Sequence, residues 1–171
     1  MVNKINLAAM GLTMMLVFGA CSLLGNDQTA FCTAAQTVQE QKSAIEAAAI
    51  TVVTLHSTGK ISDAVYTQAQ TAYGKWAAVQ KTAVDGLVTW NDAGASPNYA
   101  SIVAAILVNM ATLYTDFQNV YVTINGVPPM APAIQATAAE SSCTYTDAQL
   151  MSMYADPWSA LAPVSRKHHK H

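Results

Sequence analysis

Apolar residues recur at helical spacing along most of this chain. From residue 31, two interleaved sets repeat every seven residues: Phe31, Val38, Ile45 and Val52 in one, and Ala34, Gln41, Ala48 and Leu55 in the other. Side chains at this spacing share one face of a helix. The pattern predicts a helix of about 28 residues that ends near Gly59, because glycine readily takes the left-handed conformation that closes helices.

Two further stretches have the same period. Residues 62–90 form one, with Ser62 or Asp63 as N-cap. Its expected buried face is Val65, Ala69, Ala72, Trp76, Val79, Ala83 and then Gly86 or Leu87. The next begins with Ser96 as N-cap and Pro97 in the first turn, and it ends at Gly126 and two prolines.

The third helix has the widest apolar stripe. Its central residues are Ile102, Ile106, Met110, Leu113, Phe117, Val120 and Ile124, and its flanking residues are Val103, Leu107, Tyr114 and Tyr121. An apolar stripe of this width is typical of a helix that faces a core. We therefore expect the third helix to be the most buried of the three.

Short turns between long helices predict an all-α, up-down-up bundle. Residues 131–142 have a weak short helical pattern, and Thr146 and Gln149 have capping-box spacing that predicts a better helix over residues 146–154. We expect a C-terminal return segment that runs back along the bundle, with this short fourth helix at the end where the first helix begins.

The charge of the chain is low and unevenly placed. Only 11% of the 171 residues are charged, which is under half the usual quarter, and the formal net charge is -2. The length suits one domain. Residues 21–165 hold four lysines against ten acidic residues, whereas residues 166–171 read RKHHKH. An acidic body argues against a nucleic-acid partner.

The first 21 residues resemble a bacterial lipoprotein signal. Lys4 gives a positive start, residues 5–18 are apolar, and FGAC at residues 18–21 places two small residues before Cys21. Phe18 departs from the aliphatic residue that the family prefers. The resemblance implies removal of residues 1–20, acylation of Cys21 with palmitate-like chains, and a periplasmic location. Ser22 favours the outer membrane over the inner one.

Two alternatives to the lipoprotein signal stay open. Residues 5–24 form an uncharged run that is long enough to span a bilayer as an uncleaved anchor. Ordinary secretion is the other. With the lipoprotein interpretation, residues 1–20 are a signal peptide, 21–27 a linker to the lipid anchor, 28–163 the helical bundle domain and 164–171 a basic, histidine-rich tail.

The chain has three cysteines, so in an exported protein one of them has no second cysteine with which to form an intramolecular disulfide. Acylation of Cys21 accounts for the odd cysteine, so Cys32 and Cys143 can form a disulfide in an oxidising compartment. Two buried free thiols are the alternative.

The sequence offers little that points to catalysis. It lacks the common hydrolase, metalloprotease, phosphate-binding and haem-attachment motifs, and we assign no catalytic residue, metal ligand or cofactor. His56 is expected to interact with the end of the first helix. Trp76 falls on the predicted core face, which leaves Trp90 and Trp158 as candidates for a sugar-stacking surface. The acidic residues are expected on solvated faces: Glu40, Glu46, Asp63, Asp85, Asp92 and Asp116.

The tail and one hairpin suggest two classes of function. Residues 56–87 are similar to a helical hairpin of small phage- and prophage-encoded lipoproteins, in which a glycine-capped turn precedes an alanine-rich helix. That resemblance implies an envelope role in lysis or superinfection exclusion. We therefore expect a non-enzymatic, membrane-anchored module with an envelope protein partner. A small periplasmic enzyme or a metal-handling protein that uses the histidines of the tail is the alternative.

Overall fold

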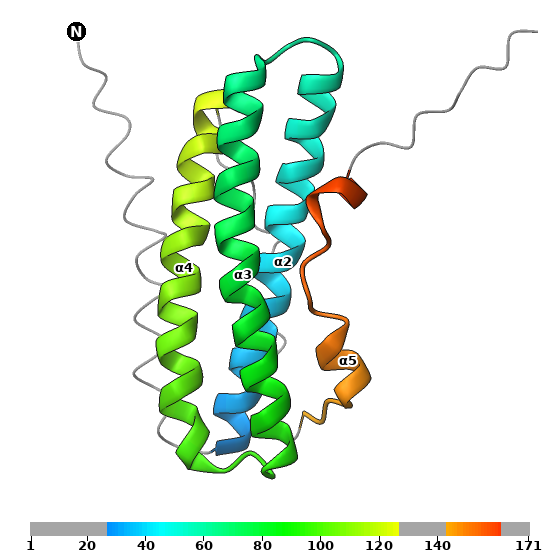
Figure 1. Ribbon diagram of the computed structural model, residues 1–171. Helices are drawn as coiled ribbons and strands as arrows, with labels where there is room; N and C mark the ends of the chain where they lie inside the picture. The colour runs from blue at the N-terminus through cyan, green and yellow to red at the C-terminus, as the bar shows by residue number, and fades with distance from the viewer. Residues whose placement is uncertain (1–26, 127–142, 162–171) are drawn as a thin grey trace, which may run out of the picture.

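Three long helices form the body of the structure (Figure 1). The computed structural model describes residues 27–126 and 143–161. Helix α2 spans Asp27–Ser57, α3 spans Asp63–Asp92 and α4 spans Pro97–Asn125. Short turns join them, so α2 and α4 run in one direction and α3 in the other. The predicted all-α, up-down-up bundle is confirmed, and the described ranges hold no strand.

The capping and helix-breaking residues that predicted the helix ends do lie at those ends. Gly59 follows α2 with φ +69°, and Gly126 follows α4 with φ +75°. Both values lie in the left-handed region that residues with a β-carbon avoid. Ser62 caps α3, because its hydroxyl oxygen accepts a hydrogen bond from the backbone N–H of Val65 at 3.4 Å. Pro97 opens α4.

Residues 143–161, which we call the strap, lie against α2 and α3 (Figure 1). The strap contains helix α5 (Asp147–Met151) and the short 3-10 helix η2 (Trp158–Leu161). Thr146 and Gln149 form the predicted capping box. The amide of Asn91, at the end of α3, donates to Asp147 at 3.2 Å. The chain has therefore returned to the end where α2 begins, as predicted, while the weak helix expected over residues 131–142 lies outside the described residues.

The buried face of α3 differs from the predicted one. Ala69, Trp76, Ala83 and Leu87 are buried as expected, but the full buried set is Ala69, Tyr73, Trp76, Gln80, Ala83, Val84, Leu87 and Trp90. Val65, Ala72, Val79 and Gly86 are only half-buried. The strap explains the difference, because it covers the side of α3 that carries Tyr73 and Gln80.

The prediction that α4 is the most buried helix is wrong. Four of its 29 residues are buried: Val103, Met110, Phe117 and Tyr121. Ile102, which the stripe placed in the core, is 55% exposed. Helix α4 packs against α2 and α3 on one side, and the strap lies on the other two helices. Its apolar stripe is therefore wider than the surface that its neighbours cover.

Candidate functional site

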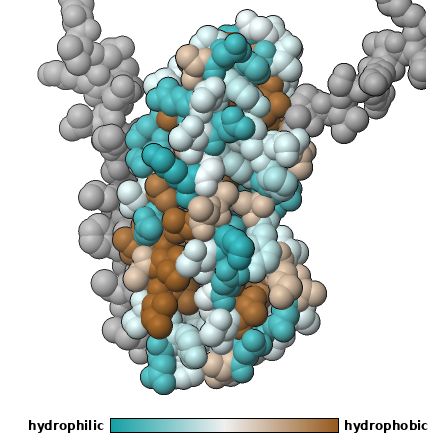
Figure 2. Space-filling model, in the orientation of Figure 1, coloured by the Kyte–Doolittle hydropathy of each residue, from teal (hydrophilic) through white to brown (hydrophobic). Residues whose placement is uncertain are grey.

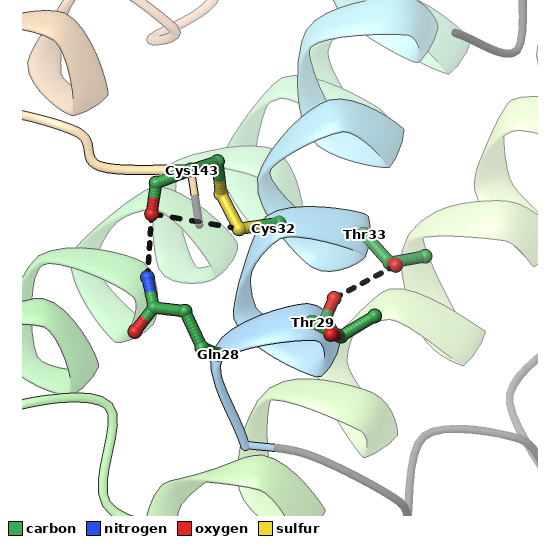
Figure 3. Close-up of a disulfide and its surroundings, with 5 residues drawn as sticks. All are labelled: Gln28, Thr29, Cys32, Thr33 and Cys143. Carbon is green, nitrogen blue, oxygen red and sulfur yellow. Dashed lines mark hydrogen bonds between the residues drawn. A yellow bond between two sulfur atoms is a disulfide. The ribbon is translucent and has the colours of Figure 1, made fainter. Parts of the chain in front are cut away.

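Several polar side chains of α2 and α3 hold the strap against these two helices. At its start, Cys32 in the second turn of α2 is joined by a disulfide to Cys143, the first residue of the strap (Figure 3). Their Cα atoms are 6.0 Å apart, a common separation for a disulfide. The side-chain amide of Gln28 donates to the carbonyl of Cys143 at 2.5 Å. The structure thus brings Cys32 and Cys143 together, as the cysteine count predicted.

Gln80 holds the middle of the strap. Its side chain is completely buried, with 0% exposure. The amide nitrogen Nε2 donates to the carbonyl of Met153, and the amide oxygen Oε1 accepts from the backbone N–H of Ala155 at 3.0 Å. A glutamine amide carries both a donor and an acceptor, so one side chain satisfies two strap groups that burial would otherwise leave unpaired.

Tyr73 and Glu46 hold the next residue of the strap from opposite helices. The Tyr73 hydroxyl donates to the carbonyl of Asp156 at 2.6 Å, and the Glu46 carboxylate accepts from the backbone N–H of Asp156 at 2.7 Å. Lys42 donates to the other Glu46 oxygen at 2.7 Å. Burial, and then the negative charges of Glu46 and Asp156, raise the pKa of Tyr73 far above its usual value of about 10.

A surface contact lies beside Gln80. The hydroxyl of Tyr154 on the strap donates to Asp85 at 2.5 Å, and Lys81 donates to the other oxygen of Asp85 at 2.8 Å. Hydrogen bonds from Lys81 and then Tyr154 lower the pKa of Asp85. The Lys81 ammonium also lies 5.3 Å from the centre of the Tyr154 ring, within range of a cation–π contact.

The strap ends in an aromatic cluster. The indole N–H of Trp158 donates to the hydroxyl oxygen of Tyr66 at 2.7 Å. The ring of Tyr66 stacks on His56, with ring centres 4.0 Å apart, and His56 Nε2 lies 2.8 Å from a carboxylate oxygen of Asp63. His56 does occupy the last turn of α2, as expected, but it also joins α2 to the start of α3.

The candidate sugar-stacking surface is not formed. Trp90 is 1% exposed and packs edge-to-face with Phe31 at 5.4 Å, so this correction places it in the core with Trp76. Trp158 is half-buried and turned toward Tyr66. Sugar rings need an exposed aromatic face, and Trp90 offers none.

Acidic residues have two kinds of environment. Asp63, Asp85, Asp92 and Asp116 are exposed, as expected, whereas Glu40 and Glu46 are half-buried. Burial raises the pKa of Glu40. Within residues 27–126 and 143–161, no three His, Cys, Asp or Glu side chains gather closely enough to hold a metal ion. Cys21 and the histidines of the tail lie outside these residues.

Sequence reasoning missed the polar residues that hold the strap. Gln80 and Tyr73 follow the same steps of three and four as the apolar core of α3, and this spacing was the available signal for them. Their partners are backbone groups about 75 to 85 positions away in sequence, and no local pattern reveals such partners.

Comparison of the chain with protein-family models, with curated proteins and with solved structures gave no match.

Proposed function

We propose that this protein is a lipid-anchored protein of the bacterial envelope whose helical bundle acts as a non-enzymatic binding or structural module. The observation that carries this proposal is the use of the polar side chains that face the strap. Gln80, Tyr73 and Glu46 each bond to the backbone of the strap. Side chains that are occupied in this way stabilise a fixed shape and leave few groups for chemistry on a substrate.

The Cys32–Cys143 disulfide supports the location. Disulfides persist in oxidising compartments such as the periplasm and are rare in the bacterial cytosol. Pairing of these two cysteines leaves Cys21 as the remaining thiol, which is the acylated residue in the proposed lipoprotein. The similarity of residues 56–87 to hairpins of phage lipoproteins extends the proposal to a role in lysis or superinfection exclusion.

Fractionation of cells tests the anchor. The wild-type chain is expected in the membrane fraction, and an inhibitor of lipoprotein signal peptidase should make the uncleaved precursor accumulate. Cys21→Ser should also remain uncleaved, because the modified cysteine is the recognised feature. Cys32→Ser is the matched control, since it removes a cysteine of the bundle and should leave processing unchanged. Normal processing of Cys21→Ser would contradict the proposal.

A further inference from the structure

The Cys32–Cys143 disulfide fixes the start of the strap to the first two turns of α2. Two weaker contacts lie beside it. The side-chain amide of Gln28 donates to the carbonyl of Cys143, and the ring of Tyr145 packs edge-to-face with Phe31, with ring centres 6.0 Å apart. The disulfide is the covalent bond among these contacts, so the place of residues 143–145 depends on which cysteine Cys143 is joined to.

The strap covers apolar side chains on its way along α2 and α3. Its own Leu150 and Met153 are 0% and 1% exposed. Figure 2 shows hydrophobic surface gathered over the N-terminal half of α4, whereas the side with the strap is mostly hydrophilic or intermediate in hydropathy. A strap that is detached at its start would expose Leu150 and Met153 more often, because fewer contacts would then oppose local opening.

A third cysteine lies within reach of the disulfide. Cys21 precedes Asp27, the first residue of α2, by six positions, which span at most about 20 Å. Cys32 lies five positions into α2, about 7.5 Å along the helix axis. The Cα atom of Cys143 is 6.0 Å from that of Cys32. The chain that precedes α2 is therefore long enough to bring the sulfur of Cys21 to the disulfide.

The two cysteines of the disulfide differ in their access to solvent. Cys32 is 2% exposed, whereas Cys143 is half-buried. Thiol–disulfide exchange begins with the attack of a thiolate on one of the two sulfurs, and access helps to decide which sulfur is attacked. An incoming thiolate is therefore expected to attack Sγ of Cys143.

The exchange is balanced within one chain. The thiolate of Cys21 attacks Sγ of Cys143, the bond between Cys143 and Cys32 breaks, and a bond between Cys21 and Cys143 forms. The electron pair leaves on Sγ of Cys32, which takes from water the equivalent of the proton that Cys21 lost. One disulfide and one thiol are present before and after, so the step needs no external oxidant or reductant.

We propose that Cys21 is a second disulfide partner for Cys143, and that acylation of Cys21 locks the Cys32–Cys143 bond. The attacking species is a thiolate. Transfer of a lipid to the sulfur of Cys21 leaves a thioether, which has no thiolate and does not exchange. The locking step rests on the proposed function, whereas the exchange rests on the reach and access of the three cysteines. The lipid thus anchors the chain and also fixes the start of the strap.

Cell-free synthesis of the full chain without membranes tests the exchange, because Cys21 then stays unmodified. Cys32→Ala leaves Cys21 as the one intramolecular partner for Cys143. Oxidation in a glutathione buffer with detergent should join these two cysteines in most of the chain, as measured by peptide mapping without reduction.

The matched control combines Cys32→Ala and Cys143→Ser with Thr58→Cys. Thr58 is exposed and follows α2, about 45 Å from the start of that helix and beyond the reach of Cys21. The bond from Cys21 to position 58 should form at least tenfold less. Equal bonding in the control and in Cys32→Ala, or no bond in either, would overturn the proposal.

The chain with all three cysteines shows which sulfur is attacked. After incubation of the unacylated chain at pH 8, at least a tenth of Cys143 should be bonded to Cys21, whereas Cys21→Ser should contain the Cys32–Cys143 bond alone. A Cys21–Cys32 bond in place of the expected one would overturn attack at Cys143. An unacylated chain that keeps a free Cys21 thiol throughout would overturn the exchange.

Cys32→Ala extracted from membranes separates this proposal from the lipid anchor. If Cys21 is acylated, Cys143 has no partner and should react with a maleimide reagent in the unreduced chain. A Cys21–Cys143 bond in this material would refute the anchor alone and support the exchange. Absence of that bond from the cell-free chain would refute the exchange alone.

Discussion

Gln80 bonds to two backbone groups of the strap through one side chain. Replacing it with leucine removes both hydrogen bonds to the strap and leaves the carbonyl of buried Met153 and the N–H of half-buried Ala155 without these partners. We expect Gln80→Leu to lower the free energy of unfolding by about 2–4 kcal/mol in urea denaturation. Gln68→Leu, at an exposed position of the same helix, is the control and should change it by less than about 0.5 kcal/mol. Equal effects of the two variants would contradict the role given to Gln80.

The hydroxyl of Tyr73 makes the stability of the folded protein depend on pH in the alkaline range. Burial raises the pKa of Tyr73 in the folded protein, so the folded state holds this proton when the unfolded state has lost it. The stabilisation is therefore complete below about pH 10 and declines as the pH rises further, by at most about 1.4 kcal/mol per pH unit. Tyr73→Phe should have a shallower decline in unfolding experiments between pH 9 and 11. Parallel pH profiles would contradict this.

The difference between Val79 and Gln80 shows what the sequence can predict about single residues. Hydropathy favours Val79 for the core, yet Gln80 is buried and Val79 is half-buried. A glutamine is stable in the interior only if its amide finds partners. Those partners come from a strap whose path depends on long-range contacts, so the sequence pattern predicts the core of α3 only to within one position.

The positions of the helices were predictable from the sequence, but the extent to which neighbouring elements bury each helix was not. Glycine, serine and proline determine helix ends through local backbone conformation, so Gly59, Ser62, Pro97 and Gly126 predicted the boundaries well. How much of a helix is buried depends on how many neighbours it has. The apolar stripe of α4 therefore predicted burial that two neighbouring helices do not provide.

Close packing of α3 and α4 depends on Gly86. A β-carbon there would lie 3.3 Å from Cγ2 of Val103 and 3.7 Å from Cδ1 of Ile106, whereas one at Gly74 would meet nothing within 4 Å. Alanine is the better helix former by about 1 kcal/mol. Gly74→Ala should therefore raise the free energy of unfolding by about 0.5–1 kcal/mol, and Gly86→Ala should gain less. A larger gain at position 86 would show that the two helices are not in close contact.

The disulfide attaches the strap to the bundle. It closes a loop of 111 residues, and a cross-link of this length stabilises a fold by about 4–5 kcal/mol in the chain-entropy model. Reduction should lower the free energy of unfolding by up to this amount. Amide exchange should become faster in residues 143–161 first, while the long helices keep their protection. Uniform loss of protection along the chain would contradict a separate role for the strap.

In the whole molecule, the start of α2, the disulfide and the proposed lipid anchor lie at one end of the bundle. Helix α2 begins there, Cys143 is bonded to it, and only five residues separate Cys21 from Asp27. A lipid on Cys21 would hold this end within about 20 Å of the bilayer, because an extended residue spans about 3.3 Å. The acidic bundle would then extend away from the membrane.

The intact mass of the protein extracted from membranes tests both the lipid anchor and the disulfide in one experiment. A lipid-anchored chain with this disulfide lacks residues 1–20, carries added acyl mass on Cys21, and gains the mass of two hydrogen atoms on reduction of the Cys32–Cys143 bond. A chain that keeps its first 20 residues and has no added mass would contradict the lipid anchor. A mass that reduction leaves unchanged would contradict the disulfide that attaches the strap.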